Sequence, residues 1–252
     1  MAPDTHTQRL LPQPFKLLRG NEQDVGCLVS AGCNHFPFFK DNLEDWLHVD
    51  EQRYYKTLKA ERRQASYLLG RITAKKALLE TGSDSPYSGI NIRMGAFKDP
   101  VPVFPSDRPR QVGITHTSTM AASLAFPSTH PMAIDLEDLD EKRAQTMQKH
   151  CHPAEWEEMN GEEMDQTLLY TILWTAKEAI AKALRIGLTS PFSLLAVKGL
   201  KQHPESGWVG FYQHFTQYQF RSWRVADRVV SIVFPRQTQL VFDKESPVLQ
   251  SP

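Results

Sequence analysis

The sequence has little cysteine, no excess of either charge and no long apolar run. Its three cysteines, Cys27, Cys33 and Cys151, form no CxxC pair and no spacing with histidine that suits zinc, so we expect reduced thiols rather than a disulfide framework. Lys plus Arg and Asp plus Glu each total 29, which excludes a strongly charged nucleic-acid or membrane binder. No run approaches the about 20 apolar residues of a membrane helix. The first 16 residues also lack a signal-peptide core, so a cytoplasmic protein is expected.

What the chain does contain is ordinary globular composition. Hydrophobic residues make up 40%, charged residues 23% and aromatic residues 10% of its 252 positions. These values exclude a disordered chain, a coiled coil and a collagen-like fibre. The length suits one large domain or two small ones.

The order of apolar patterns predicts an α+β fold. A 3.6-residue period predicts long helices over residues 50–81 and 165–185, and each helix is followed by segments with strand character. Those segments are 112–126, 132–137, 208–211, 218–223, 229–234 and 240–242. No sequence repeat is evident, yet helix then strands occurs twice, which predicts two α+β halves at 17–128 and 129–244. The two ends of the chain are expected to be loosely held.

Two acidic side chains stand on one face of the strand predicted at 132–137. Alternate strand residues share a face, so Asp135 and Glu137 point together while Ile134 and Leu136 face the core. Neighbouring carboxylates repel unless a cation or a proton lies between them. A solvated strand edge is the alternative interpretation.

The second long helix carries charges beside an indole. Trp174, Glu178 and Lys182 follow one another at four-residue intervals and form one stripe, with Lys177 beside it. A Glu–Lys pair at this spacing is common on solvated helices. The indole in the same stripe favours a half-buried wall instead.

Further polar residues stand in the first half. Thr115 and His116 end a strand rich in hydroxyl side chains, and Arg63 and Arg71 lie eight residues apart on the first long helix, roughly on one face. Taken singly, each is more typical of a structural histidine or a solvated basic face.

Together these motifs resemble the 4′-phosphopantetheinyl transferases of the surfactin-synthetase-activating (Sfp-type) family. The resemblance rests on a Thr-His-Thr strand end, a D-x-E strand about twenty residues later and the run W-T-A-K-E-A-I-A-K, in that order. Within the family, the segments LLGR and AKKALLETG resemble most the branch that activates enterobactin synthase. Thr115-His116-Thr117 replaces the more usual Ser-His-Ser, and Ala133 replaces a glycine.

The resemblance implies a fold, an activity and partners. The fold is two similar α+β halves related by a pseudo-two-fold axis, with the active-site cleft between them. The activity moves 4′-phosphopantetheine from coenzyme A, the co-substrate, to a serine of an apo acyl or peptidyl carrier protein. The products are the holo carrier and adenosine 3′,5′-bisphosphate. The ion is Mg²⁺, with Mn²⁺ as the alternative. The protein is expected to act as a monomer, with no nucleic-acid or membrane partner.

The resemblance also implies roles for individual residues. Asp135, Glu137 and Glu178 would hold the metal, which hard oxygen ligands suit. Glu178 and Lys182 would be catalytic, and Glu155 would be the general base. Coenzyme A would be bound by the residues Arg63, Arg71, Lys98, Thr115, His116, Trp174, Lys177 and Lys182. The carrier is expected to dock on residues 141–165.

Two other functions compete with this interpretation. A Mg²⁺-dependent nucleotide or pyrophosphate hydrolase would use the same acids with water as nucleophile. A non-catalytic module that binds a carrier protein or coenzyme A would need none of the chemistry, although all of the predicted metal carboxylates and lysines are present. The pathway stays open between siderophore, polyketide, polyunsaturated-lipid and fatty-acid synthesis.

Overall fold

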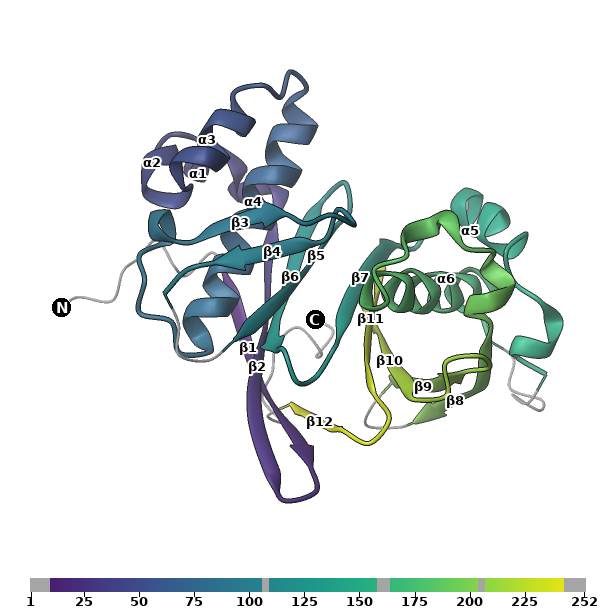
Figure 1. Ribbon diagram of the computed structural model, residues 1–252. Coiled ribbons are helices and arrows are strands. Elements are labelled where there is room, and N and C mark those ends of the chain that lie inside the picture. Colours follow the sequence, from purple (N-terminus) through teal and green to yellow (C-terminus); the bar gives the residue numbers. More distant parts are fainter. Residues whose placement is uncertain (1–9, 106–108, 158–163, 204–206, 243–252) are drawn as a thin grey trace. The chain divides into compact units, whose positions relative to one another are not determined.

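The chain forms two compact units, each with its own sheet and core (Figure 1). The computed structural model describes residues 10–105, 109–157, 164–203 and 207–242. Unit 1 contains the described residues up to Thr129 together with 240–242, and unit 2 runs from His130 to Gln239. None of the described helices is long and apolar enough to cross a membrane.

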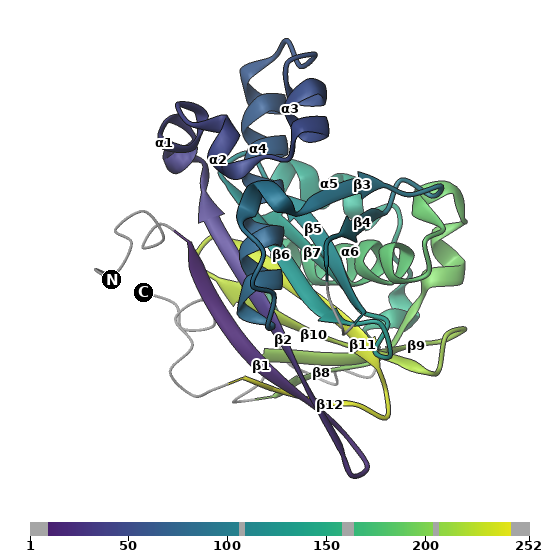
Figure 2. The ribbon, with the colours of Figure 1, turned by 60° about the vertical axis from the view of Figure 1, so that its left-hand side comes forward.

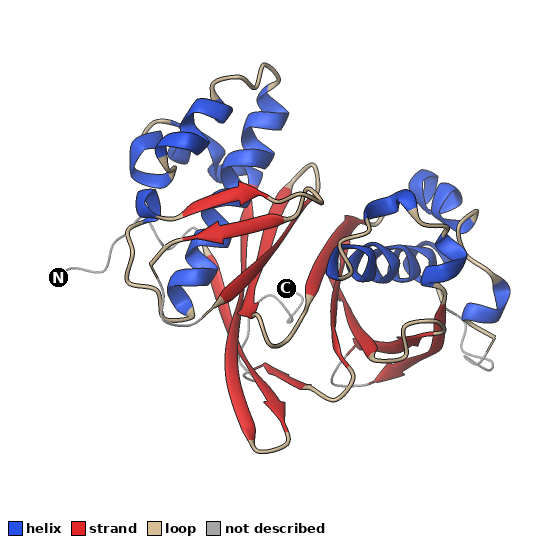
Figure 3. Cartoon of the chain, in the orientation of Figure 1, coloured by secondary structure: helices blue, strands red, loops and turns tan. Residues whose placement is uncertain are grey.

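Unit 1 is built on a five-stranded sheet in the order β12-β1-β2-β6-β5, and it also contains helices and a small hairpin (Figure 3). Its strands are β1 (Leu11–Arg19), β2 (Glu22–Gly32), β5 (Arg110–His116), β6 (Met120–Pro127) and β12 (Gln239–Phe242), and the hairpin is β3 (Asn91–Met94) with β4 (Pro100–Val103). Its helices are α1 (Phe36–Lys40), α2 (Leu43–Trp46), α3 (Val49–Tyr55) and α4 (Glu61–Glu80), with 3-10 turns at Cys33–His35 and Tyr87–Gly89.

The long hairpin β1–β2 corrects the prediction of a loosely held start. The two strands pair antiparallel from Leu11↔Ser30 to Arg19↔Glu22 and lie side by side in both ribbon views (Figures 1 and 2). Phe15 and Leu17 alternate with exposed residues and are buried, so one face of β1 belongs to the core.

The helix predicted over 50–81 is two helices, α3 and α4, with a break at residues 56–60. Ala60 has extended backbone angles, φ −85° and ψ 126°, and the side-chain amide of Gln64 donates a hydrogen bond to the carbonyl of Leu58. A side chain thus satisfies a backbone group that a continuous helix would have satisfied itself. Helix α4 then packs on the sheet through residues such as Leu69 and Ile72.

Unit 2 repeats this plan with a five-stranded sheet in the order β7-β11-β10-β9-β8. The strands are β7 (Ala133–Asp138), β8 (Val197–His203), β9 (Gly207–Tyr212), β10 (Tyr218–Val225) and β11 (Arg228–Pro235). The helices are α5 (Glu141–Gln148) and α6 (Gln166–Ala183), with 3-10 turns at Pro153–Glu155, Gly187–Thr189 and Phe192–Leu195.

The second long helix agrees with its prediction. Asp165 caps α6 by accepting a hydrogen bond from the amide of Leu168, and Arg185, at φ 57°, lies in the left-handed region just beyond its end. The buried face of α6, including Ile172 and Ile180, packs on β7 and β11. Three strands predicted in the tail are confirmed as β9, β10 and β11, whereas β12 joins the sheet of unit 1. The α+β class is therefore confirmed.

Candidate active site

Strand β7 presents its acidic face to helix α6. Ser231 of β11 is the register partner of Asp135, and its hydroxyl lies 2.6 Å from that of Thr175 on α6. Side chains of register partners share a face of the sheet, so Asp135 lies on the face that the helix covers. Ile134 and Leu136 are buried on the opposite face. The acids thus lie beneath α6 and not on a solvated strand edge.

Two cations hold the acids of β7. Lys182 of α6 places its Nζ 2.5 Å from Oδ1 of Asp135 and also donates to the carbonyl of Ile134 at 3.3 Å. Arg143 of α5 places its guanidinium 2.7 Å from Oε2 of Glu137. Asp135 is only 2% exposed, so its charge depends on such partners for compensation.

Glu178 experiences the charges of both acids. Burial and the negative charge of Asp135 raise the pKa of Glu178 to about 7; Lys182 opposes this shift and Glu137 adds to it. Burial and then Asp135 likewise raise the pKa of Glu137. The three carboxylates of the predicted metal site therefore lie close enough to repel one another.

The chemistry of these donors suits Mg²⁺, because carboxylate oxygens are its usual protein ligands and a divalent cation would relieve their repulsion. No group of three or more His, Cys, Asp or Glu side chains within the described part of the chain has the geometry of a metal site. In the structure, Lys182 and Arg143 compensate two of the acids instead. A metal bound here would compete with these ammonium and guanidinium groups.

Trp174 is half-buried, as its stripe predicted. Its ring stacks on Phe192 with centroids 5.0 Å apart and planes at 19°, and the imidazole of His150 lies 5.5 Å from the indole. These aromatic contacts cover the helix one turn before Glu178. No motif predicted the contribution of Phe192.

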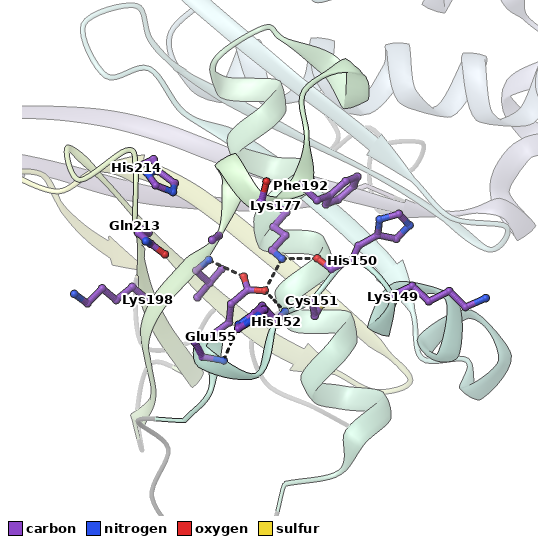
Figure 4. A pocket seen from close by; sticks show the side chains of 14 residues that line it. Lys149, His150, Cys151, His152, Glu155, Lys177, Phe192, Lys198, Gln213 and His214 are labelled. Atoms are coloured by element: carbon purple, nitrogen blue, oxygen red, sulfur yellow. Dashed lines mark hydrogen bonds and ion pairs between the residues drawn. The ribbon is translucent and has the colours of Figure 1, made fainter.

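Glu155 and Lys177 form a buried ion pair. Lys177 Nζ lies 2.7 Å from Glu155 Oε2 and also donates to the carbonyl of His150 (Figure 4). The amide of His152 donates to the same carboxylate oxygen and that of Val197 to Oε1, both at 2.7 Å. The exposed fractions of the two side chains are 4% and 1%. Glu155 was predicted as the general base and Lys177 as a ligand of coenzyme A. In the structure, both side chains form their hydrogen bonds within the protein.

A pocket of about 690 Å³ lies beside this pair, within unit 2 (Figure 4). Cations and histidines dominate its polar lining, and Glu155 is its one acidic side chain. The labelled lining residues are Lys149, His150, Cys151, His152, Glu155, Lys177, Phe192, Lys198, Gln213 and His214. Burial raises the pKa of the Cys151 thiol to about 12, so this sulfur is not a ready nucleophile.

Arg71 lies in a second pocket, of about 390 Å³, within unit 1. Its guanidinium stacks on Tyr67 at 4.6 Å, and its Nε lies 3.5 Å from Oε1 of Glu51. The ring of Tyr54 packs in turn against that of Tyr67, with centroids 4.9 Å apart and planes tilted by 46°. Arg63 lies on the first turn of α4 and is exposed, so the two arginines predicted as one face differ in burial.

Three other residues predicted to bind coenzyme A lie in two further segments of unit 1. Thr115 is buried and His116 exposed at the end of β5. Lys98 is exposed in the turn between β3 and β4, where its backbone φ is 62° and its amide donates to the carbonyl of Gly95.

Comparison with known proteins gives one family match. Residues 131–233 match the family model of the 4′-phosphopantetheinyl transferase superfamily, a segment that runs from before β7 into β11 and includes Asp135, Glu137, Glu178 and Lys182. This match supports a 4′-phosphopantetheinyl transferase as the enzyme class.

Among solved structures, the chain is similar to a holo-(acyl-carrier-protein) synthase from Bacillus anthracis strain Ames in complex with CoA (3′,5′-ADP). The identity is 18% and the TM-score 0.38, over 44% of this chain and 95% of that one. No curated protein sequence matches the chain.

Proposed function

We propose that this protein transfers 4′-phosphopantetheine from coenzyme A to a serine of an apo acyl or peptidyl carrier protein and releases adenosine 3′,5′-bisphosphate. The observation that supports this most is the coincidence of two findings in unit 2. The segment matched by the superfamily model contains Asp135, Glu137 and Glu178, and these are the carboxylates whose charges act on one another under α6.

The reaction is a displacement at phosphorus. The serine oxygen forms a bond to the phosphorus on the pantetheine side of the diphosphate, and the bond from that phosphorus to the bridging oxygen breaks. The bridging oxygen leaves as part of the 5′-phosphate of adenosine 3′,5′-bisphosphate, and the serine proton passes to that phosphate or to water. Such transfers depend on cations placed against the phosphate oxygens. Mg²⁺ held by Asp135, Glu137 and Glu178 would supply a Lewis acid to the diphosphate.

Lys182 is the residue of unit 2 best placed to assist. Its side chain is 35% exposed while its Nζ lies on Asp135, so the ammonium lies at the border between the acids and solvent. If a metal compensated the charge of Asp135, the same ammonium could contact a phosphate oxygen. Lys177 does not offer this, because it is buried and bonded to Glu155.

Unit 1 is assigned the nucleotide end of coenzyme A. The guanidinium groups of Arg63 and Arg71 would contact the 3′-phosphate, since a planar fork suits phosphate oxygens. Thr115 and His116 would hold a phosphate, and Lys98 would lie toward the adenine. The enterobactin-type branch, service of siderophore or polyketide synthesis, a monomeric state and a cytoplasmic location stay predictions.

The test is a carrier assay read by mass spectrometry. Apo carrier proteins of the acyl and peptidyl types are incubated with coenzyme A, MgCl₂ and the purified protein. We expect the mass of the carrier to increase by one phosphopantetheine. With EDTA present during the incubation, we expect no increase. Cleavage of coenzyme A with every carrier mass unchanged would instead identify a hydrolase. Binding without either change would identify a non-catalytic module.

A further inference from the structure

The buried Glu–Lys pair of unit 2 has a counterpart in unit 1. There, Lys75 of α4 places its Nζ 2.5 Å from Oε2 of Glu51 and donates to the carbonyl of Trp46 at 2.8 Å. The amide of His48 donates to Oε2 of Glu51 and that of Ile92 to Oε1, both at 3.0 Å. Every contact of the Glu155–Lys177 pair therefore recurs with a residue at the matching place.

The agreement extends to the residues around each pair. Each glutamate is the fourth residue of a His-x-x-Glu segment whose histidine Nδ1 accepts a hydrogen bond from the amide two positions later, at 3.2 Å in both units. Each lysine ends a Thr-Ala-Lys run. The hydroxyl of Thr73 lies 2.7 Å from that of Ser123, and the hydroxyl of Thr175 lies 2.6 Å from that of Ser231. The two units thus share a motif that their sequences reveal only in short fragments.

Each pair joins the long helix of its unit to three other segments. Through the lysine, the helix bonds the carbonyl of Trp46 in unit 1 or His150 in unit 2, within the segment that precedes the glutamate. The glutamate belongs to the His-x-x-Glu turn and accepts a hydrogen bond from an amide at the start of the strand that follows the helix. The long helix is thereby joined to that turn and to that strand. The pairs are almost wholly buried, so water cannot replace these bonds cheaply.

Each pair also borders the predicted ligand residue of its own unit. Oε1 of Glu51 lies 3.5 Å from Nε of Arg71, which is one helical turn before Lys75. Lys177 directly precedes Glu178 in α6, so a displacement of one backbone position displaces the other. The duplicated arrangement therefore stands next to different chemistry in each unit.

We propose that Glu51–Lys75 and Glu155–Lys177 are two copies of one positioning pair, the first placing Arg71 for coenzyme A and the second placing Glu178 for the metal. The ligand assignments rest on the proposed function, whereas the anchoring of the two helices does not. Glu155 is on this account a positioning residue, because its carboxylate already accepts hydrogen bonds from three donors and has no need of a substrate proton.

The first experiment measures anchoring without any ligand. Hydrogen exchange of the full-length protein is compared between wild type, Glu155→Gln and its matched control Glu51→Gln. We expect Glu155→Gln to accelerate exchange in α6 and at Val197 while α4 is unchanged, and Glu51→Gln to accelerate exchange in α4 and at Ile92 while α6 is unchanged. Glu155→Asp and Glu51→Asp, which keep the charge, are measured alongside and decide the outcome if a Gln variant does not fold. The proposal would be overturned if neither substitution changed the exchange rate of the helix in its own unit, which is α6 for Glu155 and α4 for Glu51.

The second experiment separates the two ligands by calorimetry. Mg²⁺ and coenzyme A are titrated separately into each variant. We expect Glu155→Gln to weaken Mg²⁺ binding about 10- to 100-fold, as is usual when the support of a metal ligand is removed, and to leave coenzyme A binding within about twofold. Glu51→Gln should do the reverse. Equal losses of both ligands in both variants would contradict separate positioning. If wild-type protein bound neither Mg²⁺ nor coenzyme A, the proposed function would be wrong. If the exchange results still followed the expected pattern, the anchoring of the two helices would stand.

Discussion

Lys182 Nζ lies 2.5 Å from Oδ1 of Asp135 and joins the C-terminal half of α6 to the centre of β7. The carboxylate is 2% exposed, whereas the side chain of Lys182 is 35% exposed. The pair therefore has a fixed, buried anion and a cation that solvent can reach. The ammonium of Lys182 is thus a positive charge in direct contact with Asp135.

Replacement of Lys182 by methionine should make the protein more dependent on magnesium for stability. Asp135 would lose its charged donor, and we expect the free energy of unfolding without metal to fall by about 1–3 kcal/mol. A bound divalent ion would supply the missing positive charge, so MgCl₂ should raise the Tm of Lys182→Met more than that of wild type. Thermal unfolding with and without MgCl₂ measures both effects. A smaller magnesium shift in the variant than in wild type would contradict a shared site.

Replacement of Glu178 by glutamine should stabilise the metal-free protein and remove most of its activity. Burial and repulsion by Asp135 raise the pKa of Glu178 from 4.5 to about 7. Above that pH the folded protein holds an ionised carboxylate that is less stable there than in the unfolded chain, so folding carries an electrostatic cost. Removal of this charge should raise the free energy of unfolding at pH 8 by about 1–2 kcal/mol, after allowance for partial screening.

Denaturant unfolding in EDTA and carrier modification at limiting Mg²⁺ together check the Glu178→Gln variant. Glu80→Gln is a suitable control, because Glu80 is an exposed residue of α4 that pairs with Lys76 and is far in the sequence from the acids. Near-normal turnover of Glu178→Gln, or a loss of stability in EDTA, would count against Glu178 as a metal ligand.

Sequence periodicity predicted the elements that carry a regular apolar pattern of their own. The 3.6-residue period identified α6, and the alternation in β7 placed Asp135 and Glu137 on one face. In the structure, burial and the charges of both acids raise the pKa of Glu178. The break between α3 and α4 could not be predicted, because no Gly or Pro marks it. It depends on a bond from the Gln64 side chain to the Leu58 carbonyl.

Other features had no such pattern in the sequence. Strand β1 contains Pro12 and Pro14, which argue against a strand until its partner β2 is known. Glu155 was predicted as a base from the family resemblance, and no pattern in the sequence links it to Lys177, 22 residues later. The Thr-Ala-Lys run common to α4 and α6 and the His-x-x-Glu segment before each helix are the signals that could have revealed the duplication.

Replacement of His116 by alanine should raise the coenzyme A requirement and leave stability unchanged. The imidazole is exposed at the end of β5, so its loss removes little packing. Loss of one hydrogen bond to a charged phosphate should raise the KM for coenzyme A about 10- to 100-fold with a smaller change in kcat. Steady-state kinetics with varied coenzyme A provides the measurement. An effect confined to kcat would assign His116 to the chemical step instead.

Lys75 should titrate near pH 8. Burial lowers the pKa of its ammonium from 10.5 to about 8; Glu51 of α3 opposes the shift, and the positive charge of Arg71 on α4 adds to it. The folded-state pKa lies below that of the unfolded chain, so between about pH 8 and 10.5 the unfolded chain binds more protons at this lysine. The contribution of Lys75 to the free energy of unfolding should therefore rise with pH across that window.

NMR of lysine labelled with ¹³C at Cε follows the titration of Lys75 directly, and the signal missing in Lys75→Met gives its assignment. Lys76, which is partly exposed and bonds Glu80, serves as the internal comparison. Chemical unfolding of the wild type from pH 7.5 to 9.5 then tests the linked gain in stability. A Lys75 signal that does not titrate until above pH 10 would show that attraction to Glu51 outweighs the cost of burial. The Glu51–Lys75 pair would in that case behave as a permanently charged anchor of α4.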